Sequence, residues 1–515
     1  MSEPPRTQNE IQTINNWMML PCADGSASSG GVAFGDWILR HGGDDSLSLA
    51  EDGVARVGIL GFCIDADTGA GRDECAKRLL VADDGEFHRR LVRLSGCYVV
   101  LRQVPGGGLR IYGDATHTMP VYYAKSRDGH VVAGAYEKAV AEIVGAGESR
   151  LFRAMYGGEY ATDSVSAGDV TLYEGVRCLL PNHFLDMRTG APARYFPFET
   201  LEPVTTDAEV DAIVDRTIAR AKTVFKAIAA RYGVAVPLTA GYDSRTVAAI
   251  ARSALAEMGP EASSNRLKFY TFRLKGMAGD EFDIKVSREI ASRLGLDYSL
   301  YLAEEPDEGL CDHLMRFLGD TRKWDGTFEA VYRRELGGRC KLNGSLADQI
   351  GKASIGYDLP DWTASSLYLM TKHRNVSWRT YPLIRKWRRE AAHGARGYAI
   401  YDLWSWELCL GRWSSDAFSL TSAAGIREIN VFNCTAVLAD WCRLSRKART
   451  AKVLHMRILG KLAPEMLGFP FNPNKRTLDF LRGIRPVLWL GAWIKFWRAR
   501  FGKRVNRVQW KRHVA

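Results

Sequence analysis

The stretch from Val234 to Leu255 constrains the fold more than any other part of this chain, because it predicts a strand, a turn and a helix in immediate succession. Residues 234–238 are mainly apolar and are typical of a buried strand. After a turn that contains Gly241, apolar side chains recur at helical spacing, at Val247, Ile250, Ala251, Ala254 and Leu255. The turn therefore lies between the carboxyl end of a strand and the amino end of a helix. Backbone N–H groups and the helix dipole favour a phosphate at such a junction.

The turn itself, residues 239–244, carries side chains that suit a triphosphate. Thr239 and Ser244 have hydroxyl groups that can donate hydrogen bonds to phosphate oxygens, and Asp243 can hold a Mg²⁺ ion that bridges those oxygens. Its sequence, Thr-Ala-Gly-Tyr-Asp-Ser, is not a Gly-x-x-x-x-Gly-Lys-Ser/Thr phosphate loop. The plainer interpretation is an ordinary strand-to-helix turn with Ser244 or Asp243 as the N-cap.

Strands and helices alternate on both sides of this turn. An amphipathic helix from Val210 to Ile228 comes before it and ends near Gly233. After it, the pattern predicts strands at residues 267–274 and 298–302, separated by a helix at residues 279–295. This alternation predicts an α/β fold with a doubly wound parallel sheet, in which ligands bind beyond the carboxyl ends of the strands.

The turn resembles the pyrophosphate loop of the ATP-pyrophosphatase group, Ser-Gly-Gly-x-Asp-Ser, with Thr239 in place of Ser and Ala240, which adds a methyl group, in place of the first Gly. Residues 342–349 resemble the asparagine synthetase segment Leu-Ser-Gly-Glu-Gly-Ser-Asp-Glu. The chain is therefore similar to the asparagine synthetase family. The resemblance implies ATP and Mg²⁺ as cofactors, with Asp243 and Asp348 as the metal ligands. The alternative for Asp348 is a surface residue in a glycine-containing turn.

By the same resemblance, ATP would contact both loops and the end of the second strand, where Tyr270, Thr271 and Phe272 would line the adenine pocket. The expected ATP-binding residues are Leu238, Thr239, Ala240, Gly241, Tyr242, Asp243, Ser244, Phe272 and Gly344.

The front third of the chain resembles the glutaminase domain of the same family. The segments that carry this likeness are residues 96–101, 109–115, 120–123, 171–176, 180–183 and 194–196. The resemblance implies an N-terminal α+β sandwich of the Ntn-hydrolase type, followed by an ATP-pyrophosphatase domain with a doubly wound parallel sheet. The expected divisions are residues 1–200, 201–480 and a C-terminal tail, 481–515.

The glutaminase reaction itself is expected to be lost. Working glutaminase domains of this family begin with a Cys whose own amine is the base. This sequence begins Met1-Ser2-Glu3-Pro4-Pro5 and has no Cys before Cys22. β-Lactam synthetases and lasso-peptide cyclases, which resemble it in this respect, join an activated carboxylate to an amine of the substrate.

Three segments near the carboxyl end resemble family landmarks, namely residues 425–433, 452–454 and 462–464. In the first, Asn433 replaces the final Asp of Gly-x-Glu-x-Arg-x-Pro-Phe-Leu-Asp. The family's pyrophosphate-binding lysine should follow Pro464 by about eight residues, where this chain has Asn472. Lys475 is the expected catalytic cation beside Asp243 and Asp348, with Arg476 as its alternative, and a solvated loop charge is an equally good interpretation of either.

Composition limits the remaining possibilities. The ten cysteines form no Cys-x-x-Cys pair, so neither a zinc site nor a disulfide framework is predicted. No signal-peptide pattern opens the chain, and we expect a cytoplasmic protein. Much of the net charge of +11 comes from residues 480–515, which contain ten Lys or Arg and no Asp or Glu, with Trp489, Trp493 and Trp497 at helical spacing. This tail could contact a membrane peripherally or dock against the preceding domain; nucleic acid is not expected.

The expected activity is that of an ATP-dependent carbon–nitrogen ligase that works through an acyl-adenylate and releases AMP and pyrophosphate. Its partners would be a carboxylate substrate and an amine, either of which could belong to a peptide. Three substrate classes stay open: a peptide closed into a lasso macrolactam, a sugar acid of a surface polysaccharide, and a small-molecule amide or lactam. The alternative of another kind is a catalytically weakened scaffold that binds nucleotide without turnover.

Overall fold

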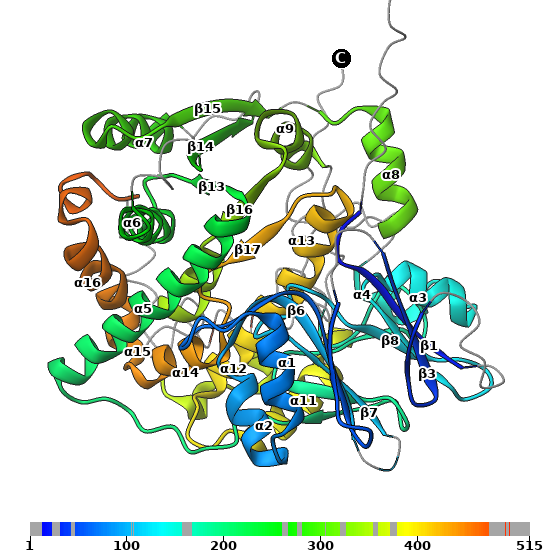
Figure 1. Cartoon of the computed structure of the whole chain (residues 1–515). Coiled ribbons are helices and arrows are strands. Elements are labelled where there is room, and N and C mark those ends of the chain that lie inside the picture. The colour runs from blue at the N-terminus through cyan, green and yellow to red at the C-terminus, as the bar shows by residue number, and fades with distance from the viewer. Residues whose placement is uncertain are drawn as a thin grey trace, which may run out of the picture.

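The computed structural model describes residues 13–22, 31–42, 47–104, 106, 108–156, 167–259, 266–274, 281–303, 305–319, 326–353, 359–370, 378–472, 490 and 494. Within them the protein is mixed α/β, with two antiparallel sheets and one parallel sheet. Figure 1 shows the antiparallel sheets in the amino-terminal part, in blue and cyan, and the parallel sheet in the green and yellow part that follows. The tail 481–515 lies outside the described residues, apart from Leu490 and Ile494.

The amino-terminal part contains two sheets of six antiparallel strands. In order across the first sheet, the strands are β10 (Arg177–Cys178), β8 (Tyr122–Lys125), β9 (Val131–Gly134), β1 (Asn16–Pro21), β3 (Trp37–Gly42) and β2 (Val32–Phe34). Across the second they are β12 (Ala191–Arg194), β11 (His183–Asp186), β7 (Leu109–Gly113), β6 (Leu94–Gln103), β5 (Arg56–Asp65) and β4 (Leu47–Glu51).

The two antiparallel sheets face each other across one apolar core. Trp17 and Leu39 of the first sheet and Val99 and Ile111 of the second belong to the same buried cluster. Helices α1 (Arg72–Leu80) and α2 (Asp84–Leu91) cover the outer face of the second sheet, and α3 (Glu137–Val144) covers that of the first. Strands β5 and β6 are buried along almost their whole length because both of their faces are covered.

The carboxyl-terminal part is built on a parallel sheet. Its strand order is β15 (Tyr298–Ala303), β14 (Leu267–Leu274), β13 (Gly233–Pro237), β16 (Arg339–Asn343) and β17 (Glu428–Asn430), and every pairing is parallel. This confirms the predicted parallel sheet and its first three strands. The chain runs outward from β13 to β15 and then returns to place β16 on the other side of β13.

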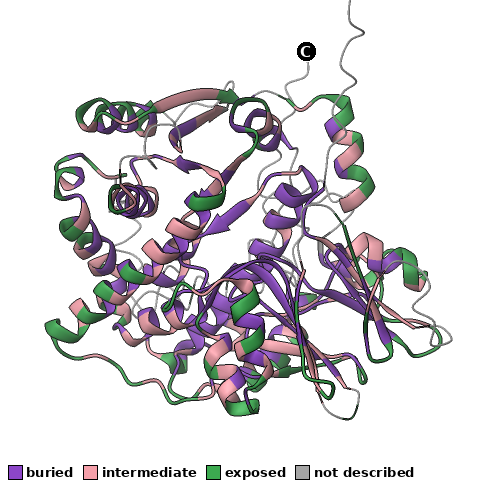
Figure 2. Ribbon diagram, in the orientation of Figure 1, coloured by how far each residue is buried: buried purple, intermediate pink, exposed green. Residues whose placement is uncertain are grey.

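Helices cover both faces of the parallel sheet. Val234, Val236 and Leu238 share a core with α5 (Asp207–Arg231), α6 (Tyr242–Glu257), α7 (Glu281–Leu294) and α16 (Val453–Leu462). The alternate residue Ala235 faces a core that contains α8 (Glu308–Leu318), α9 (Thr327–Leu336) and α13 (Gly411–Ala423). The purple strands and inward helix faces of Figure 2 follow this arrangement.

The remaining described helices lie in the carboxyl-terminal part, except the first of them, which belongs to the amino-terminal part. They are α4 (Arg150–Tyr156), η2 (Ala347–Gly351), η3 (Asp361–Thr363), α10 (Ser366–Met370), η4 (Trp378–Thr380), α11 (Tyr381–Gly394), α12 (Ile400–Trp404), η5 (Ser405–Leu410), α14 (Thr435–Arg443), α15 (Arg446–Thr450) and η6 (Pro464–Gly468). Among the helices that the structure describes, none has the length and apolar character that crossing a bilayer requires.

Candidate functional site

The two loops singled out in the sequence follow neighbouring strands. Residues 238–244 come after β13 and residues 344–348 come after β16, and β13 and β16 pair directly. The strand order reverses between these two strands, so the connections that follow them leave the carboxyl edge of the sheet in opposite directions. The topology therefore brings the two predicted loops together at the place where α/β sheets usually bind ligands.

Side chains of β14 and α7 hold the first loop, residues 238–244, in place. The hydroxyl groups of Thr271 and Ser287 both donate to the Leu238 carbonyl, at 2.6 and 2.9 Å. The Ala240 backbone N–H donates to the Asp283 carboxylate at 2.8 Å, and the Ala240 side chain is fully buried. The methyl group of Ala240 is therefore packed inside the protein.

The same loop carries two neighbouring hydroxyl groups and leads into the amino end of helix α6. The Oγ atoms of Thr239 and Ser244 lie 2.7 Å apart, and the Gly241 N–H donates to Thr239 Oγ1 at 3.0 Å. Helix α6 begins after Gly241, and no side chain caps it in the described structure. The interpretation of Ser244 or Asp243 as the N-cap is therefore wrong. The first-turn N–H groups stay without the side-chain partner that a polar N-cap would supply.

Asp243, in the first turn of α6, is held by two basic side chains. His455 Nε2, on α16, lies 2.9 Å from Asp243 Oδ1, and Lys352 Nζ lies 2.6 Å from Asp243 Oδ2. An ionised carboxylate only accepts hydrogen bonds, so His455 donates through Nε2. Its Nδ1 is buried without a partner among the described residues.

Lys352 also contacts the second predicted aspartate. Its Nζ lies 2.6 Å from Asp348 Oδ1, while Gln349 Nε2 donates to Asp348 Oδ2 at 3.1 Å. Asp348 lies in the π-helical turn η2, and Lys352 follows four residues later. Asp243 and Asp348 therefore converge on one point, and a lysine ammonium occupies it.

The charged and hydrogen-bonding groups beside Asp243 and Lys352 decide in which direction their pKa values move. Burial raises the pKa of Asp243, but the hydrogen bond from His455 and the charge of Lys352 outweigh it and bring this pKa below its usual value. Burial lowers the pKa of Lys352, but Asp243 and Asp348 more than compensate and raise it. The two groups are therefore an ion pair at neutral pH.

Mg²⁺ suits this donor set. Mg²⁺ takes one or two carboxylates and completes its shell with water and phosphate oxygens, and two carboxylates here already converge on a cation. Within the described ranges, no group of three or more His, Cys, Asp and Glu side chains could hold a metal. Asp243 and Asp348 would therefore need phosphate oxygens and water to complete the shell.

A network of hydrogen bonds between largely buried polar side chains holds the second loop, residues 344–348, and the sequence did not predict this network. Glu428 on β17 accepts from Lys341 at 3.1 Å and from the Asn343 amide at 2.6 Å. The Asn343 side-chain oxygen accepts the Ser345 backbone N–H at 2.6 Å. Gly344 lies against α6, where a Cβ atom would come within 3.1 Å of Val247 Cγ2. These contacts fix the loop that carries Asp348.

The predicted adenine-pocket residues have different surroundings. Tyr270 is buried in the core, and the Thr271 hydroxyl is committed to Leu238. Phe272 is half-buried and belongs to an aromatic group, with ring centroids 4.7 Å from Tyr270 and 5.8 Å from Phe328. Of these three predicted residues, Phe272 is the one whose side chain stays partly accessible.

The chain after α16 returns to the first loop. Arg245, fully buried on α6, donates to the carbonyls of Met466 and Phe469 at 3.1 and 3.0 Å. Phe471 stacks on Tyr242 with ring centroids 4.0 Å apart, and the Asn472 N–H donates to the Ala240 carbonyl at 3.2 Å.

Residue 472, the position at which the resemblance led us to expect a lysine, therefore lies beside the loop, but it is Asn. Lys475 and Arg476 lie outside the described residues.

The structure thus brings Asp243, Asp348, Gly344 and the loop 238–244 together, with Phe272 on the neighbouring strand. It adds Lys352, His455 and Asp283, which the sequence analysis missed. Only Lys352 carried a local signal, because residues four apart share a helix face. His455 and Asp283 come from other helices, and no pattern in the sequence relates them to the loop.

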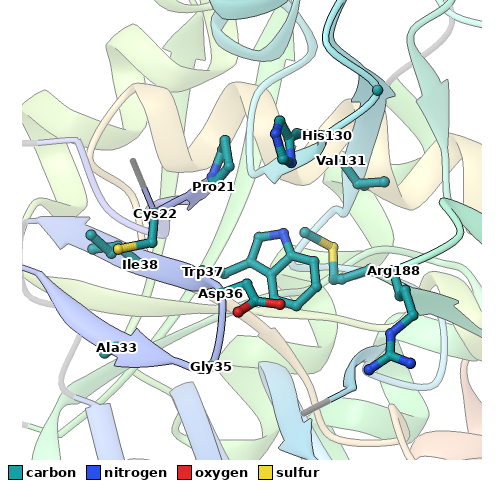
Figure 3. A pocket seen from close by; sticks show the side chains of 12 residues that line it. Pro21, Cys22, Ala33, Gly35, Asp36, Trp37, Ile38, His130, Val131 and Arg188 are labelled. Atoms are coloured by element: carbon teal, nitrogen blue, oxygen red, sulfur yellow. The ribbon is translucent and has the colours of Figure 1, made fainter. Parts of the chain in front are cut away.

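A cavity of about 450 Å³ lies elsewhere, in the sandwich (Figure 3). Its lining comes from the end of β1, the β2–β3 hairpin, the β8–β9 turn and the residues after β11, and includes Cys22, Trp37, His130 and Arg188. None of the predicted site residues lines it. Its lining therefore shares no residue with the two loops.

Neither a protein-family model nor a curated protein matches this chain. The function is therefore inferred from the residues and their arrangement.

Proposed function

We propose that this protein is an ATP-dependent carbon–nitrogen ligase that forms an acyl-adenylate and passes its acyl group to an amine. One observation carries the proposal: Asp243 and Asp348 converge beside the uncapped amino end of α6, where the strand order reverses. A helix amino end with hydroxyl groups beside it suits phosphate oxygens, and two carboxylates suit the Mg²⁺ ion that accompanies ATP.

The residues have separate roles in this proposal. The first-turn N–H groups of α6 and the hydroxyls of Thr239 and Ser244 bind phosphate oxygens. Asp243 and Asp348 hold Mg²⁺, which when bound would neutralise charge on the triphosphate. His455 and Asp283 keep Asp243 and the loop in position. These contributions are positioning and charge stabilisation, which can supply most of the rate enhancement in such displacements.

The reaction has two displacements. A substrate carboxylate oxygen forms a bond to the α-phosphorus while the bond to pyrophosphate breaks. An amine nitrogen then bonds to the acyl carbon, the bond to AMP breaks, and the amine gives up a proton. The proposal includes no glutaminase step, so the amine comes from a substrate, as in a macrolactam or the amidation of a sugar acid.

Nucleotide binding tests the proposal without knowledge of the substrate. We expect the protein to bind a fluorescent ATP analogue with Mg²⁺ and Asp243→Asn to weaken this binding at least about hundredfold, because residues that merely support metal ligands already change affinity by 10- to 100-fold. The matched control is Asp215→Asn, an aspartate that pairs with Lys461 on the surface. We expect this control to bind like the wild type.

Exchange of pyrophosphate into ATP then tests the chemistry. We expect exchange in the presence of a fractionated extract that contains the carboxylate substrate, and none with Asp243→Asn. Equal nucleotide binding by the wild type and Asp243→Asn would reject the proposed site. Binding without exchange in any fraction would favour the nucleotide-binding scaffold instead.

A further inference from the structure

Lys352 occupies the point at which the two proposed metal ligands meet. Its ammonium lies 2.6 Å from an oxygen of Asp243 and 2.6 Å from an oxygen of Asp348, and its side chain is 16% exposed. A lysine ammonium has three donors, so these two contacts use two of them. One positive charge therefore already offsets part of the negative charge of the two carboxylates before any ligand arrives.

This contact affects how a divalent cation would bind. Asp243 Oδ1 is taken by His455 and Oδ2 by Lys352, so a metal ion at Oδ2 takes the place of the ammonium. Two cations cannot share the position because like charges at contact distance repel strongly. Lys352 must therefore move before Asp243 and Asp348 can act together as metal ligands.

The Lys352 ammonium could contact phosphate oxygens once it leaves the two carboxylates. Its charge sits on a flexible four-carbon stem, and lysine binds phosphate as a point charge. The proposed triphosphate position begins at the amino end of α6, whose first turn carries Asp243. The position at which the family resemblance expects a phosphate-binding lysine is Asn472, whose N–H donates to Ala240.

We propose that Lys352 is the resident counter-ion of Asp243 and Asp348: it competes with a divalent cation for these carboxylates, and a bound triphosphate draws its ammonium onto the phosphate oxygens. The proposal rests on the proposed function, because it assumes that the ligand is a nucleoside triphosphate. It makes metal and nucleotide binding mutually dependent, since each favours the position of Lys352 that the other requires.

Two binding measurements test this role without turnover. The first is the affinity for Mn²⁺ in the absence of nucleotide, measured from the electron paramagnetic resonance of free Mn²⁺. We expect Lys352→Met to bind Mn²⁺ about 10- to 100-fold more tightly than the wild type, the range that groups beside metal ligands commonly control. Lys352→Arg keeps the positive charge and should stay close to the wild type.

The second measurement is binding of a non-hydrolysable ATP analogue in EDTA, where no metal is present. Here Lys352→Met should bind at least about tenfold more weakly than the wild type, because a charged contact to phosphate is lost. The matched control for both measurements is Lys461→Met, which removes an ion-paired lysine on α16. It should change neither affinity.

The outcomes separate this inference from the proposed function. Unchanged Mn²⁺ affinity in Lys352→Met overturns the counter-ion role, even if the wild type binds ATP normally. Tighter Mn²⁺ binding with no ATP binding under any condition supports the counter-ion role and rejects the ligase. If Lys352→Met does not fold, Lys352→Gln removes the same charge while keeping a donor for one carboxylate, and the same outcomes apply.

Discussion

Asp114 and Asp243 are both largely enclosed carboxylates, yet the protein holds them in opposite ways. Asp114 is 1% exposed and accepts hydrogen bonds from neutral donors only. These donors are the backbone N–H groups of Tyr98, Thr116, Thr118 and Met119, the Thr118 hydroxyl and the Asn433 amide. Asp243 has a side chain that is 21% exposed, and its two side-chain partners are His455 and Lys352.

The partners of these two carboxylates indicate that Asp114 has a structural role and that Asp243 is suited to bind a ligand. The donors around Asp114 are mostly backbone groups that cannot move without unfolding the turn, and Asn433 links that turn to the carboxyl-terminal part. The partners of Asp243 are side chains from two other elements, one of them a flexible lysine. A carboxylate that accepts mainly backbone N–H groups has a structural role, whereas Asp243 has one flexible charged partner, Lys352, that it can exchange for a ligand.

We expect the largest effect, a loss of folding stability, from removing the Asp114 carboxylate. Asp114→Ala leaves several buried donors without an acceptor, so we expect the free energy of unfolding to fall by about 3 kcal/mol or more. Urea denaturation followed by tryptophan fluorescence measures this change. The control is Asp84→Ala, which removes an exposed carboxylate that pairs with Arg102 and Arg110, and it should cost less than about 1 kcal/mol. Equal losses in the two variants would contradict the structural role of Asp114.

The sequence predicted the parts of this molecule that depend on local pattern. Residues 234–255 have strand and helix periodicities on either side of a glycine, and the strand, turn and α6 form there. Asp348 was placed by a motif, and the parallel sheet brings it to Asp243. The predicted limits at residues 200 and 480, the tail and Lys475 stay predictions.

The parts that the sequence did not predict depend on long-range contacts. Asn433 and Asp114 are 319 residues apart, and His455 and Asp243 are 212 apart. No periodicity relates residues at such separations, because only tertiary packing brings them together. The position of Ala240 shows the same limit: the sequence shows that its methyl group is present, but only the structure shows that it is buried inside the protein.

The two carboxylates should also differ in the sign of their pH dependence. The pKa of Asp243 is lowered from 3.8, so its ionisation stabilises the fold above this value, and that stability is lost as the pH falls through the folded pKa. Burial of Asp114 outweighs its hydrogen bonds and raises its pKa. The folded protein therefore holds a proton on Asp114 more tightly than the unfolded chain does. The stability that this gives at low pH is lost as the pH rises through the folded pKa.

Urea denaturation of the wild type, Asp243→Asn and Asp114→Asn between pH 3 and 6 checks these signs. The stability difference between the wild type and Asp243→Asn should shrink as the pH falls below about 3.8. The difference between the wild type and Asp114→Asn should shift in favour of the wild type as the pH falls toward about 3.8 from above, because the pKa of Asp114 is raised in the folded state. Other titrating groups are common to all three proteins and cancel. Slopes of the same sign would remove the distinction between the two sites.

The smallest expected effect concerns Ala240, which lies between the fixed and exchangeable sides of the first loop. Its N–H donates to Asp283, its carbonyl accepts from Asn472, and its methyl group is fully buried. Ala240→Gly introduces the glycine of the motif that this loop resembles, yet we expect it to cost about 1 kcal/mol of stability through the lost methyl group and the added freedom of the unfolded chain. Affinity for the ATP analogue should stay unchanged, because the methyl group points into the protein rather than toward the ligand. A several-fold gain in affinity would show instead that the methyl group limits the approach of nucleotide to the loop, and Ala240 would then belong with Asp243 rather than with Asp114.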